Sequence, residues 1–128
     1  MKKSNANVVM MAVGAAGYST IELIWRGHTH WSMMLAGGLS FLLFARIKIL
    51  MKNKRFLYCC ILGSAAVTLI ELIFGIFFNL ILKLDIWDYS GVPLNFLGQI
   101  CLLYSVYWAL LCIPFMPLAE KLYLKLTD

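Results

Sequence analysis

Residues 56–82 read FLYCCILGSAAVTLIELIFGIFFNLIL and contain one charged residue, Glu71. The stretch is longer than the roughly 20 apolar residues that an α-helix needs to cross the hydrocarbon core of a bilayer. Basic residues lie at both of its ends, Arg55 before it and Lys83 after it. We therefore expect residues 56–82 to form a transmembrane helix, and this helix sets the fold class.

The rest of the chain is also rich in apolar residues and poor in charged ones. Of its 128 residues, 62% are apolar and 13% are charged, about half the charged share of a typical soluble domain. Such a composition cannot cover a water-soluble globule. Three more apolar stretches predict spans at residues 5–25, 31–50 and 93–118. The sequence thus predicts an all-α membrane protein, a single transmembrane domain over residues 1–128 with four helices.

Prolines indicate where the expected fourth helix begins and where it bends or ends. Pro93 can open it, because a residue of the first turn has no intrahelical hydrogen bond to donate. Pro114 and Pro117 should bend or end it. The amphipathic tail, residues 118–126, either lies on the membrane surface or packs on its own bundle, and we favour packing because the segment is short.

The basic residues indicate the orientation in the membrane. Two of the eleven, Arg26 and Lys83, lie on one side of the predicted bundle, and the other nine lie at the termini and in the middle loop on the other side. Basic loops stay in the cytoplasm. We therefore expect both termini to be cytoplasmic, with outer loops at residues 26–30 and 83–92.

An internal repeat relates the two halves of the chain. Residues 14–24 agree with residues 63–73 at six of eleven positions, including the tetrapeptide Ile-Glu-Leu-Ile that holds Glu22 and Glu71. Two helical hairpins of the same orientation predict a pseudo-two-fold axis along the membrane normal, as in parallel transporter repeats. The repeat also argues that the first span is retained and is not a signal peptide.

Several function classes lack support. The net charge of +5 does not gather on one face, which argues against nucleic acid, and no GxxxxGK[ST] element is present, so an ATP-driven step needs a separate ATPase. No nucleophile, base and orienting acid come together, and an enzyme built on His28, His30 and Asp88 is a weak alternative. His28 and His30 could join Asp85 or Asp88 at a metal ion, but a zinc site needs three or four ligands with fixed geometry, and we favour interfacial polar residues instead. We expect no enzyme, metal or cofactor, and we expect the four cysteines to pack as apolar side chains.

Glu22 and Glu71 are the acids inside predicted spans. Both fall in the outer half of the membrane and, under the repeat, could face each other and share a proton or a cation. Intramembrane acids mark functional sites by default. The alternative is that each glutamate makes a structural hydrogen bond that holds the bundle together.

A motif in the second half carries a family resemblance. The element Trp87-Asp88-Tyr89-Ser90 is followed by the pattern P-x-N-x-x-G-x-I-C-L, residues 93–102, and Glu71 and Trp108 flank both. This arrangement resembles the bacterial membrane proteins of the putative ABC-transporter type IV family. In the first half, Gly17, Tyr18 and Glu22 are similar to the opening of these proteins. The resemblance implies a multi-pass protein of the bacterial cell membrane and a permease function.

These observations define a candidate site in the outer half of the membrane. We expect a polar cluster that is closed from above by the WDYS element, where Asp88 and Ser90 turn the chain and cap the next helix. The acids favour a small cationic or amphipathic ligand. Trp25 and Trp31, with two residues of the WDYS element, also fit an interfacial aromatic belt. The candidate substrate-binding residues are Glu22, Glu71, Asn95, Gln99, Trp87, Asp88 and Tyr89.

The expected function is that of a small permease or substrate-binding subunit. Four helices are few for a complete transport path, so we expect a homodimer or a partner membrane subunit, surrounded by membrane lipids. The competing hypothesis is a non-transporting interaction or assembly protein with structural glutamates.

Overall fold

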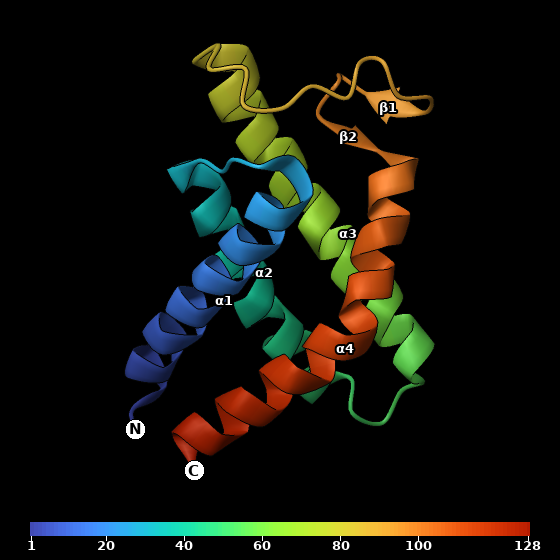
Figure 1. The fold of residues 1–128 in the computed structure, drawn as a ribbon. Helices are drawn as coiled ribbons and strands as arrows, with labels where there is room; N and C mark the ends of the chain where they lie inside the picture. Colours follow the sequence, from blue (N-terminus) through green and yellow to red (C-terminus); the bar gives the residue numbers. More distant parts are fainter.

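The computed structural model describes residues 1–128 as four long helices (Figure 1). Helix α1 spans Lys3–Arg26, α2 spans Trp31–Leu50, α3 spans Phe56–Phe74 and α4 spans Leu102–Thr127. A π-helical segment, η1 at Gly75–Ile81, continues α3 without a break. Each of the four helices is long and apolar enough to cross a membrane. The predicted all-α class with four long apolar helices is therefore confirmed, and α1, α2 and α3 with η1 lie within a few residues of the first three predicted stretches.

The fourth span begins later than the sequence predicts. Pro93 does not open a helix, because the residues after it form a small antiparallel hairpin, β1 at Asn95–Phe96 and β2 at Ile100–Cys101. Gly98 has a φ of +71°, and Leu94 and Leu97 also have positive φ, which a right-handed helix cannot contain. The Asn95 side chain donates to the carbonyls of Ser90 and Val92 and accepts from the Gly98 N–H, which stabilises this turn.

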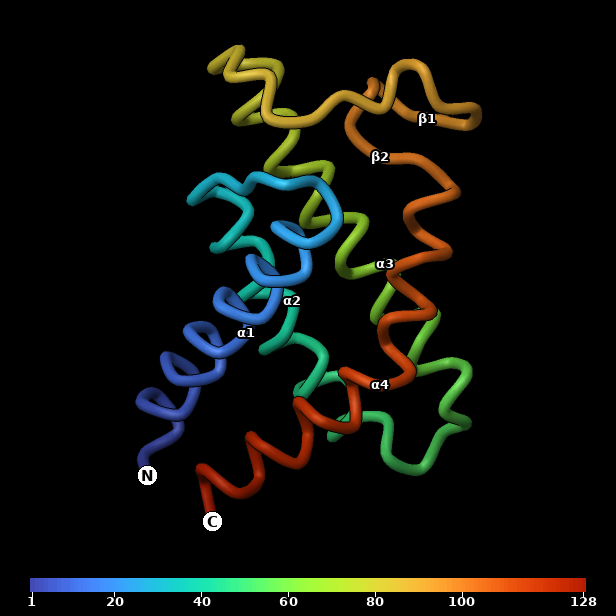
Figure 2. Tube along the Cα trace, in the orientation of Figure 1, coloured from blue at the N-terminus to red at the C-terminus, as the bar shows by residue number.

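Helix α4 continues past Pro114 and Pro117 to Thr127. Figure 2 shows its trace changing direction beyond its midpoint, in agreement with the bend expected where prolines remove backbone hydrogen bonds.

The tail packs on the bundle, as we favoured. Tyr123 is buried, and the Arg46 guanidinium lies 5.1 Å from the centre of its ring. Lys48 Nζ lies 3.6 Å from Glu120 Oε1. Both contacts join the last turns of α4 to the end of α2.

Helix α2 is the centre of the bundle and contacts the other three helices. Its approach to α1 depends on glycine: a Cβ added at Gly14 would lie 2.5 Å from the Cβ of Phe41, and one added at Gly38 would lie 2.5 Å from the backbone oxygen of Met11. All four cysteines are free and buried, as predicted. The largest completely buried side chains come from all four helices and are Met10, Met116, Cys59, Cys112 and Ser32.

Figure 1 shows both termini and the loop at residues 51–55 at one end of the bundle, and the hairpin at the other. The long connection from η1 to α4 crosses this second end and carries the WDYS element. Membrane orientation and the internal repeat stay predictions.

Candidate functional site

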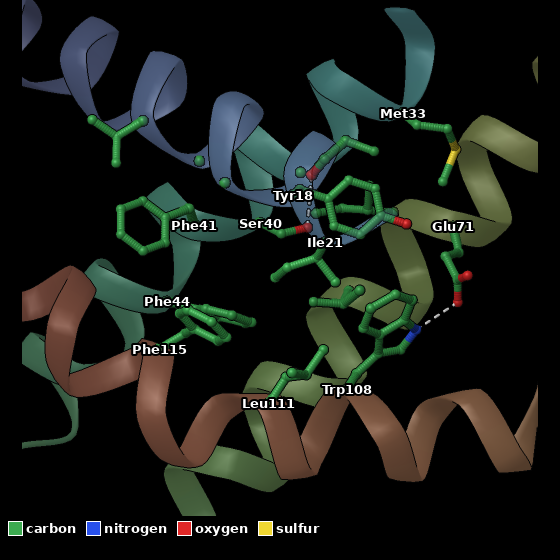
Figure 3. Close-up of a pocket in the computed structure, with 17 residues that line it drawn as sticks. Tyr18, Ile21, Met33, Ser40, Phe41, Phe44, Glu71, Trp108, Leu111 and Phe115 are labelled. Atoms are coloured by element: carbon green, nitrogen blue, oxygen red, sulfur yellow. Dashed lines mark hydrogen bonds between the residues drawn. The ribbon is translucent and has the colours of Figure 1, made fainter. Parts of the chain in front are cut away.

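Glu71 lies on α3 and is 4% exposed. Its two oxygens have separate donors: Trp108 Nε1 donates to Oε1 at 2.9 Å, and the Tyr89 hydroxyl donates to Oε2 at 2.9 Å. Figure 3 shows the bond from Trp108. Trp108 is on α4, and Tyr89 is in the connection between η1 and α4, residues 82–101, which we call the outer connection. Glu71 therefore joins three segments of the chain, and both of its oxygens accept a hydrogen bond.

Glu22 lies on α1 and is equally buried, but it is bonded differently. The Tyr18 hydroxyl at 3.3 Å and Arg26 Nη1 at 3.2 Å both donate to Oε2. Oε1 is buried and has no hydrogen-bond partner. Arg26 also donates from Nη2 to the backbone oxygen of Ile86 at 3.0 Å, which links α1 to the outer connection. One carboxylate oxygen of Glu22 is thus left with unused acceptor capacity.

The two glutamates do not share a hydrogen bond, unlike the paired carboxylates that the repeat predicted. They are linked through two aromatic side chains. Tyr18, bonded to Glu22, lies with its ring centre 6.1 Å from the ring centre of Trp108, which is bonded to Glu71. Each carboxylate therefore accepts hydrogen bonds from its own donors, and the two glutamates do not need to share a proton.

A cavity of about 630 Å³ opens beside Glu22, between α1, α4 and the outer connection. Four of the predicted site residues line it, namely Glu22, Trp87, Asp88 and Tyr89. Half of its fourteen lining residues are aromatic: Tyr18, Trp25, Trp87, Tyr89, Tyr104, Tyr107 and Trp108. We call this space the outer cavity.

A smaller cavity of about 110 Å³ lies among the four helices (Figure 3). Its lining is largely apolar, and Glu71 is its one acidic residue. We call it the inner cavity. Four side chains line both cavities and form their shared wall: Tyr18, Ile21, Trp108 and Leu111.

Two predicted site residues lie elsewhere. Gln99 is buried, accepts from Asn79 Nδ2 at 2.8 Å and donates to the Leu97 carbonyl at 3.0 Å. Asn95 is exposed and stabilises the hairpin turn. Neither lines the outer or the inner cavity. The polar cluster expected from sequence therefore does not form, because residues 93–101 are hairpin and not membrane helix.

The two aromatic residues of the WDYS element lie in different environments. Trp87 is 5% exposed and donates its indole N–H to the Gln99 carbonyl, so it is not part of an exposed belt. Tyr89 stacks on Tyr104, with ring centres 4.7 Å apart. Burial, and after it the charge of Glu71, raises the pKa of the Tyr89 phenol, which keeps it a donor.

Asp88 is exposed at the rim of the outer cavity. Its Oδ1 accepts the backbone N–H of Ser90 at 2.8 Å, which confirms the predicted turn. Hydrogen bonds from Ser90 lower the pKa of Asp88, so the rim carries a negative charge. The predicted cap is wrong, because α4 begins at Leu102 with no side-chain cap.

His30 lies in the loop between α1 and α2 and has a structural role. Its ring Nδ1 accepts the backbone N–H of Ser32 at 3.2 Å and caps α2. No three potential metal ligands lie together in the chain. Trp25 and Trp31 are exposed, as belt residues should be.

Sequence reasoning missed Arg26 as the partner of Glu22, although their four-residue spacing on a helix favours an ion pair. It also missed Tyr104 and Tyr107, whose place in the cavity wall depends on how α4 packs and leaves no signal in the sequence.

Comparison with known protein families adds an independent observation: residues 33–128 match the family described as putative ABC-transporter type IV. The chain belongs to this family. The match covers α2, α3, the outer connection and α4, and so extends beyond the second-half motif. Helix α1, with Tyr18, Glu22 and Arg26, precedes the matched residues. Neither the curated proteins nor the solved structures gave a match.

Proposed function

We propose that this member of the putative ABC-transporter type IV family is a small permease or substrate-binding subunit of the bacterial cell membrane. It takes up a small cationic or amphipathic ligand at the outer cavity. The observation that carries this proposal is the outer cavity itself, a space of about 630 Å³ whose wall includes the buried carboxylate of Glu22 and seven aromatic side chains.

The size and lining of the outer cavity support a ligand site. Its volume of about 630 Å³ lies within the range of roughly 300–1,000 Å³ that small-molecule sites occupy. Such sites have mostly apolar and aromatic walls with a few polar groups that orient the ligand. Here the polar groups are Glu22, Arg26 and Asp88.

The charges favour a cation over an anion. Arg26 is the one basic residue in the wall, and both Glu22 and the Ile86 carbonyl already occupy its guanidinium. The wall thus holds two acidic residues, Glu22 and Asp88, against one basic residue, and the carboxylate of Asp88 at the rim is ionised.

A second candidate function has its own support. Both oxygens of Glu71 have protein donors on other segments, as expected of a carboxylate that holds a bundle together. If Glu22 is equally structural, the protein is a non-transporting membrane interaction or assembly protein.

Two single variants separate these functions. The protein is purified in mild detergent, and its thermal midpoint is recorded against monovalent cations, polyamines and amphipathic amines. A ligand that binds the folded form raises the midpoint. We expect a saturable rise in the native protein that Glu22→Gln abolishes while staying folded, and a lower midpoint without ligand in Glu71→Gln. Glu120→Gln, at the opposite end of the bundle, is the control and should behave as native. No rise with any ligand, together with a destabilised Glu22→Gln, establishes the structural alternative.

Transport would need further subunits. We propose a homodimer or a complex with a partner membrane subunit, and a separate ATPase as the energy source, since the chain has no nucleotide-binding motif of its own. We propose no catalytic activity for the chain itself. Light scattering of the protein in detergent gives its oligomeric state, and a monomer at all concentrations would refute the homodimer.

A further inference from the structure

The inner cavity, which the proposed function does not use, has its mouth on one side of the bundle. Buried side chains of α2 and α3 form its floor, among them Phe41, Phe44 and Val67. Figure 3 shows the two phenylalanines facing this space. The exposed lining residues are Val13 and Gly17, both on α1, and the half-buried ones come mainly from α1 and α4. The cavity therefore opens between α1 and α4, toward the medium around the helices.

Gly17 leaves this mouth open. A Cβ added at Gly17 would meet nothing within 4 Å, whereas one added at Gly14 or Gly37, which also line the cavity, would collide with the neighbouring helix. Small residues allow helices to approach closely, which accounts for Gly14 and Gly37, but Gly17 makes no such contact. The mouth lies at mid-depth, because Val13 and Gly17 stand on either side of the centre of the predicted span at residues 5–25.

The lining has no free side-chain donor for a water molecule. Three of its polar side chains carry a donor, and each donor is already used, two on Glu22 and Glu71 and one on a backbone carbonyl. None of the chain's unpaired buried polar atoms belongs to this lining. A buried water needs about two to four polar partners, and cavities with apolar walls stay dry. The chemistry of the lining therefore favours an apolar occupant.

The volume of the inner cavity limits the size of this occupant. It is about 110 Å³, somewhat smaller than an apolar cavity of roughly 150 Å³ that takes up benzene. The end of one hydrocarbon chain fits such a space, and a lipid headgroup does not. In the predicted orientation the mouth faces the hydrocarbon core of the bilayer, which supplies chains of this kind.

We infer that the inner cavity binds the end of one acyl chain of a membrane lipid. The chain enters between α1 and α4 past Val13 and Gly17, and its end lies against Phe41 and Phe44. This site does not require a ligand in the outer cavity.

Photolabelling in a bilayer tests the site. The native protein is placed in nanodiscs of phosphatidylcholine that carries a diazirine at the end of one acyl chain, and after illumination the labelled residues are mapped by mass spectrometry. Leu69 is exposed near the centre of the predicted span at residues 56–82 and reports lipid around the bundle. Phe41 and Phe44 are buried and report a chain inside the cavity. We expect adducts on Leu69 and also on Phe41 or Phe44.

Two variants of α1 locate the entrance. Gly17→Leu should close the mouth, because Gly17 lines it and has free space for a side chain. We expect this variant to stay folded and to keep the Leu69 adduct, but to lose the adducts on Phe41 and Phe44. Ala16→Leu is the matched control, since it adds the same side chain at the neighbouring exposed position, which does not line the cavity. It should be labelled like the native protein.

The native protein decides the matter even if Gly17→Leu does not fold. Adducts on Leu69 with none on Phe41 or Phe44 would overturn the lipid site, including the case in which a second copy of the chain covers the mouth. Adducts on Phe41 that persist in a folded Gly17→Leu would also overturn it, because the chain would then not enter at this mouth. Neither result bears on the thermal shifts expected from the outer cavity, so the two proposals fail separately.

Discussion

Tyr18 and Trp108 lie with their ring centres 6.1 Å apart, and each donates a hydrogen bond to a different buried carboxylate, Tyr18 to Glu22 and Trp108 to Glu71. The four side chains form a continuous connection from α1 through α4 to α3. Tyr18 and Trp108 also belong to the shared wall of the outer and inner cavities. Glu22 and Glu71 are thus connected through Tyr18 and Trp108, which lie in the wall between the outer and inner cavities.

Trp108→Phe should lower the free energy of unfolding by about 1–3 kcal/mol, because it leaves Glu71 Oε1 buried without this donor. Trp31→Phe is the matched control, since Trp31 is exposed and its indole N–H makes no hydrogen bond in the structure. Denaturant titration in detergent measures both. Equal stabilities of the two variants would contradict a structural role for the bond.

Replacing Gly14 or Gly17 of α1 with alanine should have very different effects on stability. A Cβ at Gly14 would meet Phe41 Cβ at 2.5 Å, whereas one at Gly17 has nothing within 4 Å. Overpacking of this kind costs about 1–3 kcal/mol, so Gly14→Ala should lower the thermal midpoint and Gly17→Ala should leave it unchanged or raise it. A tolerated Gly14→Ala would show that α1 and α2 are not in such close contact.

Stability should fall at alkaline pH through Tyr89. Its pKa is raised in the folded protein by burial and then by Glu71, so its contribution is complete below about pH 10, the pKa of an unfolded tyrosine, and is lost as the pH rises further. Thermal midpoints of the native protein and Tyr89→Phe, recorded from pH 9 to 11.5, should converge as the native protein loses this contribution. Parallel curves would assign the hydroxyl no such contribution.

The packing of the α4 tail against the bundle can be tested with two substitutions. Tyr123 is 5% exposed and Leu124 is 50% exposed. Tyr123→Ala should cost about 3–5 kcal/mol, as other aromatic truncations in a core do, and Leu124→Ala should cost far less. Denaturant titration of both variants measures the difference. The opposite order would place the tail on the membrane surface.

Three of the four long helices were predictable within a few residues, because a bilayer demands continuous apolar length and the chain shows it directly. The start of the fourth was not. Residues 93–118 are largely apolar and carry no charge, and hydropathy cannot distinguish an apolar hairpin from an apolar helix. The positive φ angles at Leu94, Leu97 and Gly98, held by the Asn95 side chain, decide between them.

The candidate site, like the helices, was predictable from the sequence only in part. Sequence identified Glu22 and Glu71 because a carboxylate in hydrocarbon needs a partner wherever the helix lies. It placed the WDYS element near them correctly, since Trp87, Asp88 and Tyr89 line the outer cavity with Glu22 and Tyr89 donates to Glu71. It could not separate Gln99 and Asn95 from the site, because their positions follow from the hairpin.

By itself, the sequence determined that the protein has four helices long and apolar enough to span a membrane and two buried acids, since both properties depend on local composition and on the cost of placing charge in an apolar medium. Only the tertiary structure decided which acid is satisfied and which is not. The donors to Glu71 lie 18 and 37 positions away in the chain, and those to Glu22 lie within one helical turn. Hydrogen bonds between distant segments depend on how the helices pack, and packing brings together side chains that no local pattern connects.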